Sequence, residues 1–138
     1  MNTKSIHTSN DQNQKTRRAM IDLLNQQLAD ALDLSLHAKQ AHWNVKGPHF
    51  IGLHELFDKV AEDLEEFIDN IAERTVELGG IALGTIHVVS KNSRLSPYPL
   101  DLVSGKGHVA RLTASLAMRL CHPKPFVYTA HEFNNHKG

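Results

Sequence analysis

Apolar side chains recur every three or four positions between about residue 16 and Gly80, which is the period of an amphipathic helix. The pattern predicts a long first helix that stops near Gly47 and Pro48, because glycine suits a helix C-terminus and proline suits the start of the next helix. The face that this helix would bury holds Met20, Leu24, Leu28, Ala31, Ala38 and His42, widened by Leu23, Leu32 and Leu36.

A second helix has the most regular pattern in the chain. Its apolar positions alternate spacings of three and four, and they are Phe50, Leu53, Phe57, Val60, Leu64, Phe67 and Ile71. The two glycines Gly79-Gly80 should end it. Since only a very short link joins the two long helices, we expect them to run antiparallel, as in a helix bundle.

The pattern weakens after Gly80. Residues 81–102 hold a short β-prone run, TIHVV, and the turn-like SPYP, so we expect a crossover segment with at most a short helix. An isolated strand there would have no obvious partner. A third helix is predicted from about Gly107 to Leu120, and its apolar face would consist of Val109, Leu112, Leu116 and Leu120.

These patterns divide the chain into three parts. Residues 1–15 are polar and predict a flexible tail, residues 16–120 form one helical domain, and residues 121–138 are an atypical segment without helical period. A chain of 138 residues with 41% hydrophobic residues can bury one core, so a single all-α domain is expected.

Composition excludes several classes of protein. Fifteen basic residues balance fifteen acidic ones, so there is no overall charge to attract nucleic acid or an anionic membrane. The lone Cys121 allows no intramolecular disulfide and no cysteine metal cluster. The N-terminus lacks an apolar signal region, and no run reaches membrane-spanning length, so a cytoplasmic protein is expected. Ten histidines make metal chemistry worth testing.

Candidate metal ligands lie on the second helix. His54 and Asp58 are spaced by four residues, as are Asp69 and Glu73, and all four fall within an arc of roughly 100° on a side away from the apolar stripe. His54 and Asp69 are roughly 22 Å apart along a helix, so one ion cannot contact both pairs in one chain. A second copy of the helix, crossing antiparallel near residues 63 and 64, would create two identical sites per dimer.

His42 ends the first helix and can approach His54 across the antiparallel hairpin. Mixed imidazole and carboxylate ligands suit iron, zinc or manganese rather than calcium. Trp43 could line the pocket or carry an oxidising equivalent. The alternatives stay open: acidic residues on a helix face are usually solvated, His42 and Trp43 can be packing residues, and His49 suits a surface or capping position.

Other motifs are weaker. HELFD, residues 54–58, imitates the zinc-protease motif but ends in aspartate, and the ExxH pair of di-iron bundles is absent. Cys121 and His122 lack a third residue for nucleophilic catalysis.

The quoted residues resemble one family. KQAHWNVKGPHFIGLHELFD, the D-x-x-x-E within IDNIAERTVELGGIALGT and the YPLD segment closely resemble the Dps family, the miniferritins or DNA-binding proteins from starved cells, over about residues 17–102. The resemblance implies a ferritin-like four-helix bundle with a ferroxidase centre at a two-fold interface. His42, His54 and Asp58 would come from one subunit, and Asp69 and Glu73 from its partner.

The resemblance also implies a function. The family forms a hollow dodecamer that binds ferrous iron, oxidises it preferentially with hydrogen peroxide, stores the ferric mineral, and in several members coats DNA in the cytoplasm or nucleoid. Carboxylates would favour the ferric product and imidazoles would hold the ferrous ion. DNA contact would rest on Lys4, Lys15, Arg17 and Arg18, although a merely solubilising tail is an equal alternative.

The resemblance stops after YPLD. Family members continue through a full third helix and a fourth, whereas no fourth helix is recognisable here, so we expect an incomplete bundle. A changed reading frame or a truncation is one hypothesis, which sequencing of the source DNA would test. The alternative to a working ferroxidase is a non-catalytic or assembly-defective relative that at most binds metal or DNA.

Overall fold

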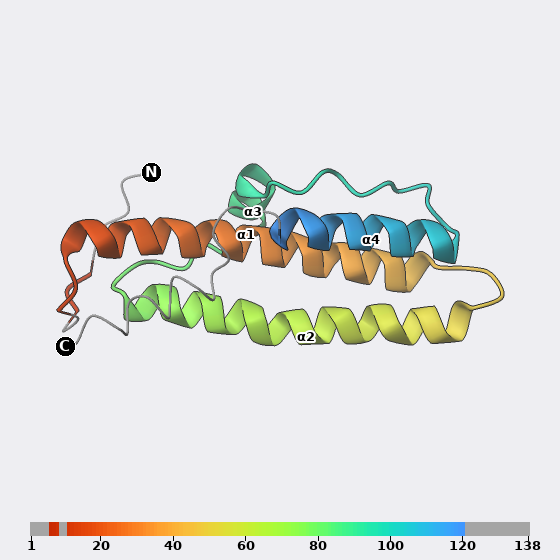
Figure 1. Cartoon of the computed structure of the whole chain (residues 1–138), viewed down its shortest axis with the longest axis horizontal. Coiled ribbons are helices and arrows are strands. Elements are labelled where there is room, and N and C mark those ends of the chain that lie inside the picture. The colour runs from red at the N-terminus through yellow and green to blue at the C-terminus, as the bar shows by residue number, and fades with distance from the viewer. Residues whose placement is uncertain (1–5, 9–10, 121–138) are drawn as a thin grey trace.

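A hairpin of two long antiparallel helices is the frame of the molecule (Figure 1). In this computed structural model, which describes residues 6–8 and 11–120, α1 spans Gln14–Asn44 and α2 spans Phe50–Glu77. Asn13 caps α1, since its side-chain oxygen accepts a hydrogen bond from the amide of Lys15 at 2.8 Å. The antiparallel arrangement predicted from the short link is confirmed.

Glycines with positive φ close both ends of this hairpin. Gly47 has φ 117° in the turn between the helices, and Gly79 has φ 80° just after α2. The amide of Gly79 donates to the carbonyl of Val76 at 2.8 Å, and the amide of Gly80 donates to that of Thr75 at 3.0 Å. This pair of bonds is a Schellman motif, so the predicted end of the second helix at the two glycines is confirmed.

The crossover contains one short helix, as predicted. This helix, α3, spans Ile86–Asn92 and lies beside α1. Buried Asp30 of α1 holds the crossover in place, because its carboxylate accepts hydrogen bonds from the backbone amide of Arg94 at 2.9 Å and from Nε at 3.0 Å. The chain then returns along the hairpin to the turn, where the amide of Lys46 donates to the carbonyl of Val103 at 2.9 Å.

The third long helix, α4, spans Gly105–Leu120 and lies beside the C-terminal half of α1 (Figure 1). The described part of the chain contains no strand. The expected absence of a fourth bundle helix concerns residues 121–138, which lie outside the described residues, as do Cys121 and the histidines that follow it.

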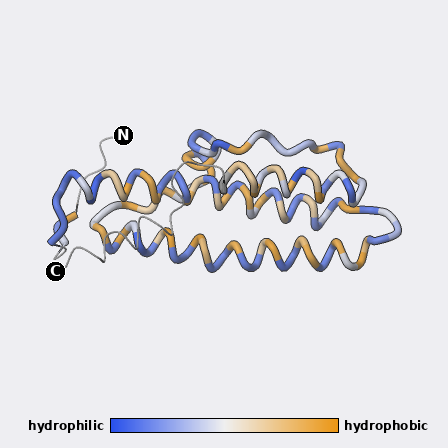
Figure 2. The backbone as a smooth tube through the Cα atoms, viewed as in Figure 1, coloured by the Kyte–Doolittle hydropathy of each residue, from blue (hydrophilic) through white to orange (hydrophobic). Residues whose placement is uncertain are grey.

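Two apolar clusters form the core. Figure 2 shows hydrophobic positions recurring along each helix between hydrophilic ones. The cluster near the turn joins α1, α2 and α4, and its buried members include Leu34, Ala38, Phe57, Leu64 and Leu112. The cluster at the other end joins α1 and α2, and its members include Ile21, Leu24, Leu28, Ile71 and Leu78.

Some predicted core positions are wrong. Leu36 is 52% exposed, because it lies on the side of α1 opposite to the buried Leu34 and Ala38, and Phe67 is 62% exposed. On α4 the buried positions are His108, Leu112 and Ser115, whereas Val109 and Leu116 are exposed. The helix is therefore rotated by about one residue from the apolar pattern, since His108 and Ser115 have polar partners inside the core.

Candidate metal centre

Two stacked histidines join the ends of α1 and α2 nearest the turn. The ring centroids of His42 and His54 are 3.7 Å apart at an interplanar angle of 25°. His42 Nδ1 donates to the backbone carbonyl of His54 at 2.8 Å, and His54 Nδ1 donates to the carbonyl of His42 at 2.8 Å. In the neutral rings, these bonds leave each Nε2 without a proton, which is the tautomer that ligates a metal.

A carboxylate lies next to this pair. Asp58 follows His54 by one turn of α2, and its Oδ1 is 4.0 Å from His42 Nε2. The same oxygen contacts the ammonium of Lys39, one turn before His42 on α1. The hydrogen bond from Lys39 lowers the pKa of the Asp58 carboxyl, and the same bond raises the pKa of Lys39. Asp58 is therefore anionic, partly exposed and within reach of two imidazoles.

The second acidic pair lies elsewhere on α2. Asp69 and Glu73 are exposed and belong to the half of the helix that runs away from the turn. They begin roughly 16 Å beyond Asp58 along the helix axis. Within the residues that the structure describes, no three His, Cys, Asp or Glu side chains are grouped closely enough to hold a metal ion. One chain thus presents two separate parts of a possible site.

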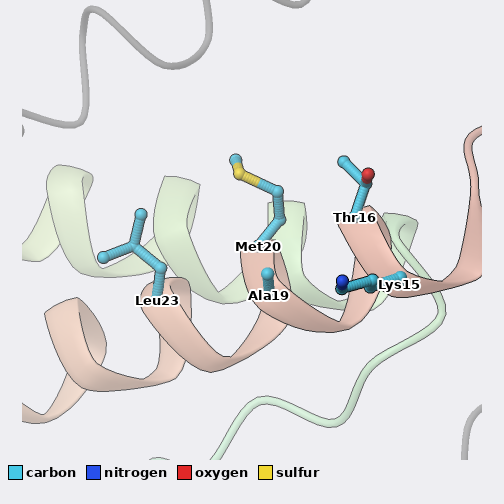
Figure 3. Close-up of a pocket in the computed structure, with 5 residues that line it drawn as sticks. All are labelled: Lys15, Thr16, Ala19, Met20 and Leu23. Carbon is cyan, nitrogen blue, oxygen red and sulfur yellow. The ribbon is translucent and has the colours of Figure 1, made fainter.

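The structure also has a surface groove on the first turns of α1 (Figure 3). It is lined by Lys15, Thr16, Ala19, Met20 and Leu23. The groove lies at the opposite end of α1 from His42, and its lining contains no imidazole or carboxylate. We do not assign metal chemistry to it.

Comparisons with known proteins give the family. The model of the ferritin-like domain matches residues 21–115. The DNA protection during starvation protein of Agrobacterium fabrum is 44% identical over 109 residues, which are 79% of this chain and 67% of the relative. The protein of the same name from Mycolicibacterium smegmatis is 38% identical over 91 residues, 66% of this chain and 50% of the relative.

Solved structures agree. The Dps of Mycobacterium smegmatis superposes with a TM-score of 0.77 at 33% identity, covering 81% of this chain and 68% of that one. DpsA14 from Streptomyces coelicolor superposes with a TM-score of 0.79 at 28% identity, covering 86% and 70%. The chain belongs to the Dps family of ferritin-like proteins. It spans about two thirds of the length of the Agrobacterium relative and half of that of the Mycolicibacterium relative.

Sequence reasoning missed one neighbour of the site in this Dps chain. Lys39 precedes His42 by three residues, so the two side chains share a face of α1. Because α1 and α2 are antiparallel, Lys39 faces Asp58 in the same way that His42 faces His54. The spacing of three shows that Lys39 and His42 share a face of α1. Only the register between α1 and α2 shows that Lys39 meets Asp58.

This Dps chain also buries two histidines away from the candidate centre. His108 of α4 and the Tyr98 hydroxyl share a hydrogen bond at 2.6 Å, and the ring of Tyr98 lies 5.0 Å from that of His37. His37 Nε2 is 3.4 Å from Asp33 Oδ1. Burial lowers the pKa of both histidines; at His37 the Asp33 carboxylate opposes this effect and Arg111 adds to it. Charging either ring would place a cation in the core.

These two histidines predict acid sensitivity. Their pKa is lower in the folded chain than the ordinary 6.5, so the unfolded chain binds more protons as the pH falls. Their contribution to stability is therefore complete above about pH 7 and is lost below it.

We expect the melting temperature to fall between pH 7.5 and 5.5, and to fall less in His108→Gln and in His37→Gln. The exposed His87 gives the control, since His87→Gln should keep the pH dependence of the parent chain. Equal pH dependence in all four proteins would contradict the assignment.

Proposed function

We propose that this Dps chain is a ferroxidase whose centres form between two copies. Each centre would contain His42, His54 and Asp58 of one subunit with the partner's Asp69 and Glu73. The chain would oxidise ferrous iron, preferably with hydrogen peroxide, and store the ferric mineral in a dodecameric shell in the cytoplasm. The observation that carries the proposal is the arrangement of the candidate ligands: His54 and Asp58 of α2 lie near the turn beside His42 of α1, and Asp69 and Glu73 lie farther along the same face of α2.

The register of the second helix favours this pairing. An antiparallel two-fold crossing near residues 63 and 64 sets His54 opposite the partner's Glu73 and Asp58 opposite the partner's Asp69. The same crossing sets Ile51 opposite the partner's Val76. In the single chain Ile51 is 69% exposed and Val76 is 56% exposed, and both lie on the face that carries the acidic residues. Apolar contacts at both ends of the crossing would thus hold the ligands together.

The ligand set suits ferrous iron and its oxidation. Two imidazole nitrogens are ligands that Fe²⁺ accepts, and carboxylates stabilise the higher charge of Fe³⁺. One hydrogen peroxide takes one electron from each of two ferrous ions and takes up two hydrogen ions from solution. Its O–O bond breaks, which gives two ferric ions and two water molecules. The side chains hold the iron and the developing charge, and none needs to act as a nucleophile.

Relatives named DNA protection during starvation proteins support a protective role, because consuming ferrous iron and peroxide together removes the reactants that make hydroxyl radical. The competing proposal is a Dps relative that folds and binds metal or DNA but does not oxidise iron. The two proposals differ in one measurable property, which is iron oxidation that depends on the acidic pair.

We predict that Asp69→Ala with Glu73→Ala lowers the rate of peroxide-dependent ferrous oxidation by at least about tenfold, because the centre loses the ligands that the partner supplies. The rate is followed by the absorbance of the ferric product. The matched control is Asp63→Ala, which removes an exposed carboxylate from a different face of α2, where it pairs with Lys59. We expect the control to keep the parent rate. Oxidation that survives in the double variant, or is absent from the parent chain, would contradict the ferroxidase proposal.

We also propose non-specific DNA binding through the start of α1. Lys15, Arg17 and Arg18 lie in its first turns, which contain no acidic residue, and the helix dipole adds to their positive potential. Lys4 would contribute as well, although it lies outside the described residues. Few charges per chain bind phosphates weakly, but many copies on one particle bind together.

Neutralising Lys15, Arg17 and Arg18 to glutamine should weaken the binding of duplex DNA and make it less dependent on salt, in gel-shift titrations at several salt concentrations. Lys91→Gln removes one exposed cation from α3 and serves as the control. A triple variant with the affinity of the parent chain would overturn this proposal.

A further inference from the structure

Lys39 contacts Asp58, the one carboxylate among the three ligands that a single subunit would supply to one centre, His42, His54 and Asp58. Its ammonium contacts Asp58 Oδ1, and this same oxygen lies 4.0 Å from His42 Nε2. Lys39 and His42 come from neighbouring turns of α1, whereas Asp58 comes from α2. A metal ion held by the two imidazoles and Asp58 would therefore need the oxygen that the ammonium already contacts.

We propose that Lys39 is a tethered competitor for the metal, which neutralises Asp58 while the centre is empty and must be displaced when a metal binds. The inference rests on the proposed metal centre and adds a determinant of its affinity and selectivity. A free monovalent cation offers Asp58 nothing that the ammonium does not already supply. A divalent ion that also binds two imidazole nitrogens gains interactions that the ammonium cannot make.

Acidic neighbours give the displaced ammonium another place to bind. Glu62 and Glu65, one and two turns beyond Asp58 on α2, act on Lys39 through their charge. Moving from Asp58 to these carboxylates keeps Lys39 paired and lowers the repulsion between the ammonium and the arriving metal. Because Glu62 and Glu65 both face the proposed crossing of α2, the displaced lysine would also offset the negative charge that gathers there.

The experiment measures the dissociation constant of Zn²⁺, which has no redox chemistry, by titration calorimetry with the full chain. Lys39→Met keeps much of the side-chain length but removes the charge. We expect it to bind Zn²⁺ about fivefold more tightly or better, since the metal no longer displaces an ion pair. Lys39→Arg retains a cation and should stay within about twofold of the parent chain. Lys59→Met is the matched control, because it breaks an exposed ion pair with Asp63 outside the centre.

The outcomes separate this inference from the proposed function. Zn²⁺ binding that is tighter in Lys39→Met, but not in Lys39→Arg or Lys59→Met, and that is lost in His54→Ala supports both the metal centre and the role of Lys39. Zn²⁺ binding that requires His54 but is unchanged or weaker in Lys39→Met overturns the role of Lys39 and leaves the metal centre standing. If neither the parent chain nor any Lys39 variant binds Zn²⁺, both the centre and the role of Lys39 are overturned. Circular dichroism of each variant establishes that a change in affinity is not a loss of fold.

Discussion

The register between α1 and α2 is the constraint on which the rest of the structure depends. It is fixed by two reciprocal hydrogen bonds, in which the ring of His42 donates to the backbone of His54 and the ring of His54 donates to the backbone of His42. A slip of one residue would break both bonds and rotate each ring away from the other helix. Because these bonds use the Nδ1 atoms, the Nε2 atoms would be the ones to bind a metal in the proposed centre, and the contact that fixes the helix register would also orient the proposed ligands.

The same register determines the electrostatics of the hairpin. It places Lys39 against Asp58, whereas Asp69 and Glu73 form no ion pair with α1 within the described residues. One subunit thus contributes imidazoles and a neutralised carboxylate at one end of α2 and an exposed acidic pair at the other. In the proposed centre, a second copy and metal cations would supply what each part lacks, so assembly, charge balance and metal binding would be aspects of one requirement.

The sequence predicts the long helices well, because their apolar periods and the glycines that end them are local signals. The two antiparallel helices, the short helix in the crossover and α4 all follow from such signals. The buried face of α4 does not follow from them, since His108 is buried with Tyr98 of the crossover as its hydrogen-bond partner. Likewise, spacing on α2 identifies the candidate ligands, but the pairing of Lys39 with Asp58 depends on two helices at once. Periodicity reports the environment of one helix and cannot report which polar groups will meet.

The central claim is that each centre is shared by two subunits, and subunit mixing tests it most directly. One variant carries His54→Ala with Asp58→Ala, and the other carries Asp69→Ala with Glu73→Ala. Neither should oxidise ferrous iron alone, because every centre lacks two of its five proposed ligands. Random mixing makes about half of the dimers mixed, with one of two centres complete, so about a quarter of the parent activity should return. Mixtures as inactive as their components, although mass measurements show mixed dimers, would contradict a shared centre.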